Sequence, residues 1–179
     1  NGIGGLASVL VAGAALVVAT DFSLDENIAT ALSGFIGSIT FIGSAVAAGK
    51  LQELKFFKKG FLLPTFLRHI LNLALVCGCG WAGYLLLNAS SDQAVLLYVA
   101  ICGLGFILGY TLTAPIGGAD MPVVIALLNS YSGLAASATG FVVGSNILII
   151  AGSLVGASGI ILTSLMCVAM NRSLLSVLF

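Results

Sequence analysis

Six long apolar runs limit the fold of this chain more than any other feature of its sequence. None of them contains Asp, Glu, Lys, Arg or His, and they cover residues 2–19, 27–48, 70–87, 94–113, 122–143 and 147–170. A helix needs about 20 apolar residues to cross a bilayer, and the runs lack the two-residue alternation of a membrane β-barrel. With 60% hydrophobic and 7% charged residues, the composition argues against a disordered chain and an ordinary soluble domain. We therefore predict an all-α integral membrane protein with six transmembrane helices.

The charged residues lie almost entirely between the runs and separate by sign when the chain is threaded alternately through a membrane. One face then carries every basic residue, namely Lys50, Lys55, Lys58, Lys59, Arg68 and Arg172. The other face receives Asp21, Asp25, Glu26 and Asp92. By the positive-inside rule, the basic face and both termini point to the cytoplasm or to the mitochondrial matrix. Because the net charge is zero and no long basic cluster occurs, a nucleic-acid partner is not expected.

The segment 50–69 interleaves aromatic residues with lysines. We favour an interfacial segment at the lipid headgroups over a docking site for another protein. His69, the single histidine, is interpreted as an interfacial residue in preference to a proton donor. The cysteines stand inside apolar stretches without the spacing of a metal site, so packing as small side chains is the preferred role of Cys77, Cys79, Cys102 and Cys167.

The first and last pairs of runs resemble each other. In one alignment of the chain with itself, Asn1, Gly5, Leu6 and Ala7 match Asn129, Gly133, Leu134 and Ala135. In a second, Gly34, Gly37, Val46, Ala47 and Lys50 match Gly156, Gly159, Val168, Ala169 and Arg172. We predict an internal repeat in which both helix pairs run in the same direction, as in duplicated proteins whose halves frame a shared pathway. Asn1 and Asn129 are then structural counterparts.

Asn129 is the most informative polar residue inside the runs, since a buried amide is costly unless it meets a partner or water. It either forms a hydrogen bond between helices or lines a water path, and both alternatives stay open. Two stripes of small residues are expected to face other helices, with close packing as the preferred role of their glycines: Gly133, Ala136 and Gly140, then Gly152, Gly156, Gly159 and Thr163. Because the runs lack acidic and basic side chains, a proton carrier must come from outside these residues.

A glycine-rich segment, 114–122, leads into the fifth run and contains Asp120 and Pro122. We expect Asp120 to cap the following helix, and Pro122 is tolerated in its first turn. The alternative is a salt bridge between Asp120 and Arg172, which flank the last hairpin on the basic face. A salt bridge that opens and closes would couple the helices to a soluble partner domain.

Several long motifs are similar to the membrane domain of proton-translocating NAD(P) transhydrogenase, in the part that leads into the NADP(H)-binding domain. They are GGADMPVVI at 117–125, LNSYSG at 128–133, LVGASG at 154–159 and MCVAMNRS at 166–173, with FIGSAVAAGKL at 41–51 and RHILN at 68–72. The resemblance implies an enzyme that transfers hydride from NADH to NADP while protons run down their gradient into the cytoplasm or matrix. It further implies that NAD and NADP bind soluble domains outside this chain, and that the complete enzyme is a homodimer in a bacterial cytoplasmic or mitochondrial inner membrane.

The resemblance also implies roles for individual residues. The helix of Asn129 would line the proton path, which we extend to Asn1, Ser130 and Ser132. Asp120 and Arg172 would lie at its mouth beneath the NADP(H) domain, and the stretch with Gly156, Ser158 and Gly159 would be sensitive to conformation. No catalytic, cofactor-binding or metal-binding residue is expected in this chain. The chain departs from many members, which carry a protonatable His at the position of Asn1; other members lack it and place a His on an earlier membrane helix.

An alternative from another class is a small-residue-rich transporter segment or a structural anchor subunit without a proton path. The short first run, headed by Asn1, favours a piece of a longer protein whose remaining membrane helices are its partners. The residues after Phe179 would distinguish the two interpretations. A transhydrogenase predicts a soluble dinucleotide-binding fold there.

Overall fold

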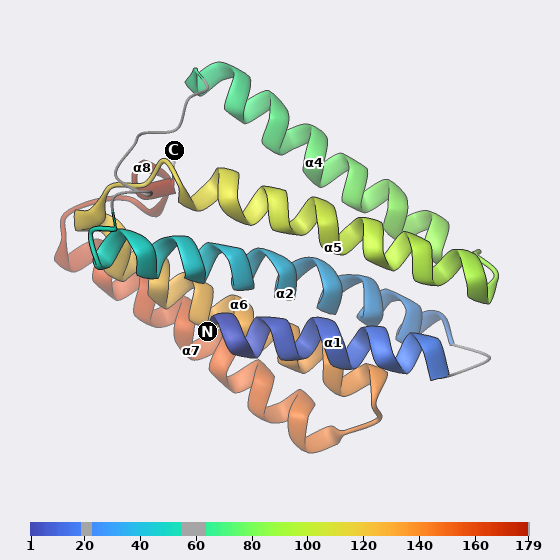
Figure 1. The fold of residues 1–179 in the computed structure, drawn as a ribbon. Helices are drawn as coiled ribbons and strands as arrows, with labels where there is room; N and C mark the ends of the chain where they lie inside the picture. The colour runs from blue at the N-terminus through green and yellow to red at the C-terminus, as the bar shows by residue number, and fades with distance from the viewer. Residues whose placement is uncertain (19–22, 55–63, 179) are drawn as a thin grey trace.

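The computed structural model describes residues 1–18, 23–54 and 64–178, except for the side chains of residues 91 and 92. These residues are helical apart from short connections and contain no strand, so the prediction of an all-α fold is confirmed for them. The helices are α1 (Gly2–Val18), α2 (Leu24–Leu51), α4 (Thr65–Leu86), α5 (Ser91–Thr113), the 3-10 turn η1 (Gly118–Asp120), α6 (Met121–Val142), α7 (Asn146–Ala169) and α8 (Leu174–Leu178), as Figure 1 shows.

Five helical segments among the described residues are long and apolar enough to cross a membrane. They are α2, α4, α5 from Gln93, η1 joined to α6, and α7. Helix α1 has 17 residues and is apolar but shorter, so a sixth crossing stays a prediction. The predicted loop 50–69 includes the ends of two helices, because α2 continues to Leu51 and α4 begins at Thr65. Its centre, with Lys55, Lys58 and Lys59, lies outside the described residues, as does Asp21.

Local capping explains where two of the helices begin. Before α2, the Ser23 hydroxyl accepts from the Glu26 amide at 3.3 Å, and a Glu26 carboxylate oxygen accepts from the Ser23 amide at 2.8 Å. This capping box starts the helix three residues before the predicted run. Before α7, the Ser145 hydroxyl accepts from the Leu148 amide at 3.4 Å. Gly144, with φ of 65°, supplies the left-handed residue that turns the chain between α6 and α7.

Helix α2 lies at the centre of the bundle, where it packs against α1, α5 and α6 (Figure 1). Helix α4 packs mainly on α5, and α7 packs mainly on α6. These two outer helices carry large exposed apolar side chains, such as Leu73 and Trp81 on α4 and Leu154 and Ile161 on α7. Such faces suit contact with lipid or with other membrane helices.

Glycines allow backbones to touch in both helix pairs of the predicted repeat. A Cβ on Gly5 would lie 2.6 Å from the Gly37 carbonyl oxygen, and one on Gly133 would lie 2.6 Å from the Gly156 nitrogen. The glycines of the two stripes face the interface between α6 and α7, as predicted for Gly133, Gly140, Gly152, Gly156 and Gly159. The register of this contact differs from that between α1 and α2. The repeat matches Gly5 with Gly133 and Gly37 with Gly159, so it would place Gly133 opposite Gly159, whereas Gly133 lies against Gly156. The internal repeat therefore stays a prediction.

The cysteines follow the packing prediction with one exception. Cys79, Cys102 and Cys167 are buried, but Cys77 is exposed on α4 because that helix is covered on one side only. No group of three or more His, Cys, Asp or Glu side chains that could hold a metal occurs within the described part of the chain.

Candidate functional site

Asn1 is held against one face of α6. Its side-chain amide donates to the Ile125 carbonyl at 3.1 Å, and the Ser132 hydroxyl donates to the Asn1 carbonyl at 3.2 Å. The approach is close, since a Cβ on Gly4 would lie 2.6 Å from the Ser132 oxygen. The start of α1 thus lies beside the first half of α6, which brings together two of the four residues predicted to line a proton path.

Asn129 lies on the same face of α6, four residues after Ile125 and three before Ser132. Its side chain is half-buried and makes no hydrogen bond with any described residue. The interhelical hydrogen bond, one of the two alternatives for this amide, is therefore not formed within the described structure. Its polar atoms remain able to bind water or a group from elsewhere.

A groove of about 460 Å³ opens beside Asn1, between the start of α1, the second half of α2 and Ile125 of α6. Its α2 wall includes Phe41, Ala45 and Ser44, whose hydroxyl oxygen is buried without a partner among the described residues. Sequence reasoning missed Ser44. A serine inside an apolar run is a weak signal, because its hydroxyl often bonds to its own helix.

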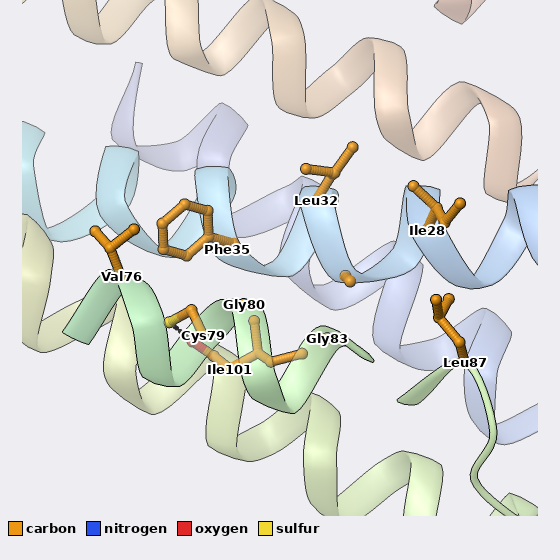
Figure 2. A pocket seen from close by; sticks show the side chains of 10 residues that line it. Ile28, Leu32, Phe35, Val76, Cys79, Gly80, Gly83, Leu87 and Ile101 are labelled. Carbon is orange, nitrogen blue, oxygen red and sulfur yellow. Dashed lines mark hydrogen bonds between the residues drawn. The ribbon is translucent and has the colours of Figure 1, made fainter. Parts of the chain in front are cut away.

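A second groove, of about 320 Å³, lies between α2 and α4 and differs in chemistry (Figure 2). Its walls are apolar side chains such as Ile28, Leu32 and Phe35. The Cys79 thiol in its wall donates weakly to the Ile101 carbonyl, with a sulfur-to-oxygen distance of 3.9 Å. Of these two grooves, the one at Asn1 has both an amide and a hydroxyl without a partner among the described residues.

Ser130 faces the opposite side of α6, toward α7. Its side chain is fully buried and its hydroxyl donates to the Gly156 carbonyl. A Cβ on Gly159 would lie 2.7 to 2.9 Å from three atoms of Ser130. Ser130 is therefore grouped with the two glycines predicted to be conformationally sensitive. Ser158 is exposed and donates to the Val155 carbonyl of its own helix at 3.0 Å, so it is not part of this contact.

Another polar contact joins α1, α2 and α6 nearer their other ends. The buried Ser33 hydroxyl lies 2.7 Å from the Thr139 hydroxyl and 3.1 Å from the Ser8 carbonyl oxygen. Thr139 also reaches the Ala135 carbonyl at 2.9 Å. Two hydroxyl protons serve three contacts here, so only two of these hydrogen bonds form at one time, and either hydroxyl can be the donor in the contact between Ser33 and Thr139.

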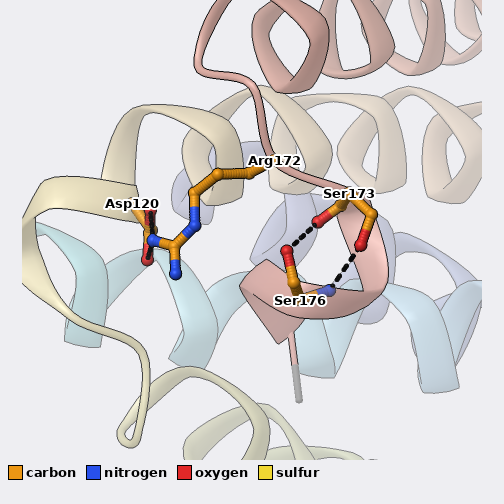
Figure 3. Close-up of polar contacts among 4 residues, drawn as sticks. All are labelled: Asp120, Arg172, Ser173 and Ser176. Carbon is orange, nitrogen blue, oxygen red and sulfur yellow. Dashed lines mark hydrogen bonds and ion pairs between the residues drawn. The ribbon is translucent and has the colours of Figure 1, made fainter.

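Asp120 forms a salt bridge and does not cap α6. Its two carboxylate oxygens both accept from Nη1 of Arg172 at 2.7 Å (Figure 3). Asp120 occupies the N-cap position without a side-chain capping hydrogen bond, so the preferred capping role is wrong. The reason is local: the turn η1 leads directly into α6 and gives Asp120 helical angles, whereas a capping side chain needs an extended residue.

The end of α7 positions Arg172. Asn171 adopts a left-handed conformation with φ of 52°, and the Arg172 amide then donates back to the Cys167 carbonyl at 3.0 Å. The chain then continues into α8, where the Ser176 amide donates to the Ser173 hydroxyl at 3.1 Å and closes the first turn (Figure 3). The side chain of Arg172 is 46% exposed and that of Asp120 only 13%. The salt bridge is thus open to solvent on its arginine side.

Comparison with known proteins agrees with the motifs. The family model described as NAD(P) transhydrogenase beta subunit matches residues 1–179. Two curated relatives, both named NAD(P) transhydrogenase subunit beta and both from Rhodospirillum rubrum, are 42% identical to this chain over 182 residues, which is 97% of the chain. The chain belongs to the NAD(P) transhydrogenase beta subunit family. The chain spans only 38% of the length of these two proteins.

In this member of the transhydrogenase beta subunit family, two of the polar regions bring predicted site residues together. In the groove region, Asn1 and Ser44 line the groove, and Asn129 and Ser132 lie beside it on the face of α6 that Asn1 contacts. The hinge region contains residues 114–120 and the salt bridge to Arg172. The contact between Ser130 and Gly159 links the two regions. Ser130 follows Asn129 on α6, and Gly159 is on α7, the helix that leads to Arg172.

Proposed function

We propose that this chain forms part of the proton path, and its gate, of a transhydrogenase that couples hydride transfer from NADH to NADP to proton movement across the membrane. The observation that carries the proposal is the contact of Asn1 with the face of α6 that bears Asn129 and Ser132, beside a groove with an unpartnered hydroxyl. Polar groups inside an apolar bundle mark ion and proton pathways in membrane proteins. NAD and NADP bind other domains of the complex, where the hydride chemistry occurs.

In this proposal the amides of Asn1 and Asn129 order water and do not carry the proton, because an amide does not titrate at any useful pH. The titrating side chain comes from another part of the enzyme and enters the groove. There it meets Asn1 and the hydroxyl of Ser44 through water.

The gate in this proposal is the salt bridge of Asp120 and Arg172. A change in the NADP(H)-binding domain opens or closes this pair, which lies at the junction of α6 and α7. The movement of α7 then reaches Ser130, and hence the helix of Asn129, through the backbone contact at Gly156 and Gly159. Two discrete arrangements of one contact are sufficient for such a switch.

The proposal includes an orientation and an assembly. The hinge and Arg172 face the cytoplasm or matrix, where positive charge accumulates. Lys50 and Arg172 both contact the hinge segment, whereas Asp25 and Glu26 begin α2 at its other end. Helix α1 crosses the same bacterial cytoplasmic or mitochondrial inner membrane as part of the complete chain, and the enzyme assembles as a homodimer with its other membrane helices.

The test is Asn129→Leu in the complete enzyme in membrane vesicles. Proton-coupled hydride transfer should fall at least about tenfold, which corresponds to about 1.4 kcal/mol, while assembly and nucleotide binding persist. The matched control is Asn27→Leu, which removes another half-buried amide, in the first turn of α2, and should leave coupled turnover unchanged. Wild-type coupled turnover in Asn129→Leu would support the anchor-subunit interpretation.

A further inference from the structure

Lys50 makes an unusual contact for a lysine at the end of an apolar helix. Its ammonium donates to the backbone carbonyls of Ala114 and Ile116, the latter at 2.6 Å. Lysines near helix ends in membranes normally extend their charge into the headgroup region. Here the side chain is half-buried and its ammonium lies against the start of the hinge segment, residues 114–120.

Of the two carbonyls that Lys50 binds, that of Ala114 is at the end of α5 and that of Ile116 lies two residues farther along the chain. Helix α5 stops at Thr113 with Ala114 as its C-cap, and the last carbonyls of a helix have no partner within it. The partial negative charge at a helix C-terminus also attracts a cation. Pro115 then breaks the helix, so Lys50 holds the chain where it leaves α5.

The two halves of the hinge segment are held differently. Ile116 is 5% exposed and packs in a cluster with Ala47 of α2, Met121 and Val124 of α6 and Cys167 of α7. By contrast, a Cβ on Gly117 or Gly118 would meet nothing within 4 Å. The segment is therefore held by packing at Ile116 and by the salt bridge at Asp120, whereas the two glycines between them have free space around their Cα atoms.

We propose that Lys50 is a positioning residue for coupling: it fixes Ala114 and Ile116, so that a change in the salt bridge of Asp120 and Arg172 moves α6 and is not lost in the hinge. The inference rests on the proposed function. It adds a residue of α2 to a gate that otherwise joins only α6 and α7. It also gives the central helix of the bundle a direct link to the hinge.

The experiment compares variants of the complete enzyme in proteoliposomes. The measured quantity is the ratio of the NADH-to-NADP hydride transfer rates with and without an imposed proton gradient. Lys50→Met, which keeps length and removes the donors, should lower this ratio at least about fivefold, the lower end of typical coupling between sites. Lys50→Arg, which keeps donors and charge, should retain most of it. Lys58→Met, which removes a charge from the same basic segment of the sequence, should leave the ratio unchanged.

Hydrogen exchange gives a second readout that general loss of stability would not produce. Amides of Gly117–Asp120 should exchange faster in Lys50→Met, while those in the middle of α6 keep their rates. If Lys50→Met does not accumulate in membranes, Lys50→Gln, which keeps a neutral donor, must show both effects. A wild-type ratio with unchanged exchange in an assembled variant overturns the inference.

Asp120→Asn in the same assay separates this inference from the function on which it rests. If Asp120→Asn loses coupling and Lys50→Met does not, only the role of Lys50 is wrong. If neither variant loses coupling, the proposed gate itself is wrong.

Discussion

The groove region and the hinge region are both polar parts of an apolar bundle, but they differ in hydrogen bonding. The charged groups of the hinge region have partners within the described residues, whereas two polar groups of the groove region have none. At the hinge, Asp120 and Arg172 pair with each other at 2.7 Å, and Lys50 binds two carbonyls. In the groove region, the Ser44 hydroxyl and, on the adjoining face of α6, the Asn129 amide have no partner among the described residues. A satisfied ion pair at a partly exposed site suits a contact that is broken and remade. Unsatisfied groups within an apolar bundle suit binding of water or of a side chain from elsewhere.

The α6–α7 contact connects these two regions, and Gly159→Ala is expected to have the largest effect on them. Its Cβ would lie 2.7 Å from the Ser130 Cβ and 2.8 Å from its Cα, so a helix backbone must shift. Overpacking of this kind costs about 1–3 kcal/mol. Coupled turnover should fall at least about tenfold, as expected for about 1.4 kcal/mol, with a lower unfolding temperature in detergent.

Gly103→Ala is the control for this substitution, because a Cβ at that position on α5 would meet nothing within 4 Å. It should leave both turnover and unfolding temperature near the wild-type values. Equal effects of the two alanine variants would show that the α6–α7 contact has no special role in joining the regions.

The second expected effect concerns the hinge and is measured by a double-mutant cycle. Asp120→Ala and Arg172→Ala should each lower the gradient-stimulated rate about fivefold or more, within the usual range of coupling between sites. The double variant should be little worse than either single one, because each change removes the same salt bridge.

Additive losses in this cycle would mean that the two side chains act separately, for example on different parts of the NADP(H)-binding domain. The comparison would then change, since the hinge would contain two independent charged contacts. Stability should change little in any of the three variants, as Arg172 is 46% exposed and such pairs contribute about 0–1 kcal/mol.

The helices were predictable because a membrane permits few structures. A backbone in hydrocarbon must satisfy its own hydrogen bonds, so apolar length alone indicated where α2, α4, α5, α6 and α7 lie. The neighbourhood of Asn1 was harder to predict. Sequence reasoning paired it with Asn129 through a repeat, whereas the structure brings it to α6 through the carbonyl of Ile125 and the hydroxyl of Ser132.

Contacts to backbone atoms were beyond sequence reasoning. Nothing in the residue types indicates that Lys50 binds the carbonyls of Ala114 and Ile116, since every residue has a carbonyl. The role of Asp120 depended on backbone angles as well. Both capping and the salt bridge suit an aspartate before a helix, and the 3-10 turn decided between them.

The smallest expected effect tests whether the unpartnered hydroxyl of the groove matters. Ser44→Ala removes a buried oxygen that has no protein partner among the described residues, so the unfolding temperature should stay the same or rise slightly. If that hydroxyl holds a water beside Asn1, coupled turnover should fall about twofold, which corresponds to about 0.4 kcal/mol and is near the lower end of the net contribution of one hydrogen bond, about 0.5–1.5 kcal/mol. The control is Ser38→Ala, a fully buried hydroxyl on the same helix that faces Gly105 of α5. A loss in Ser44→Ala that Ser38→Ala does not share would locate the water path in the groove, whereas equal rates in the two variants would leave the amides of α1 and α6 as its polar lining.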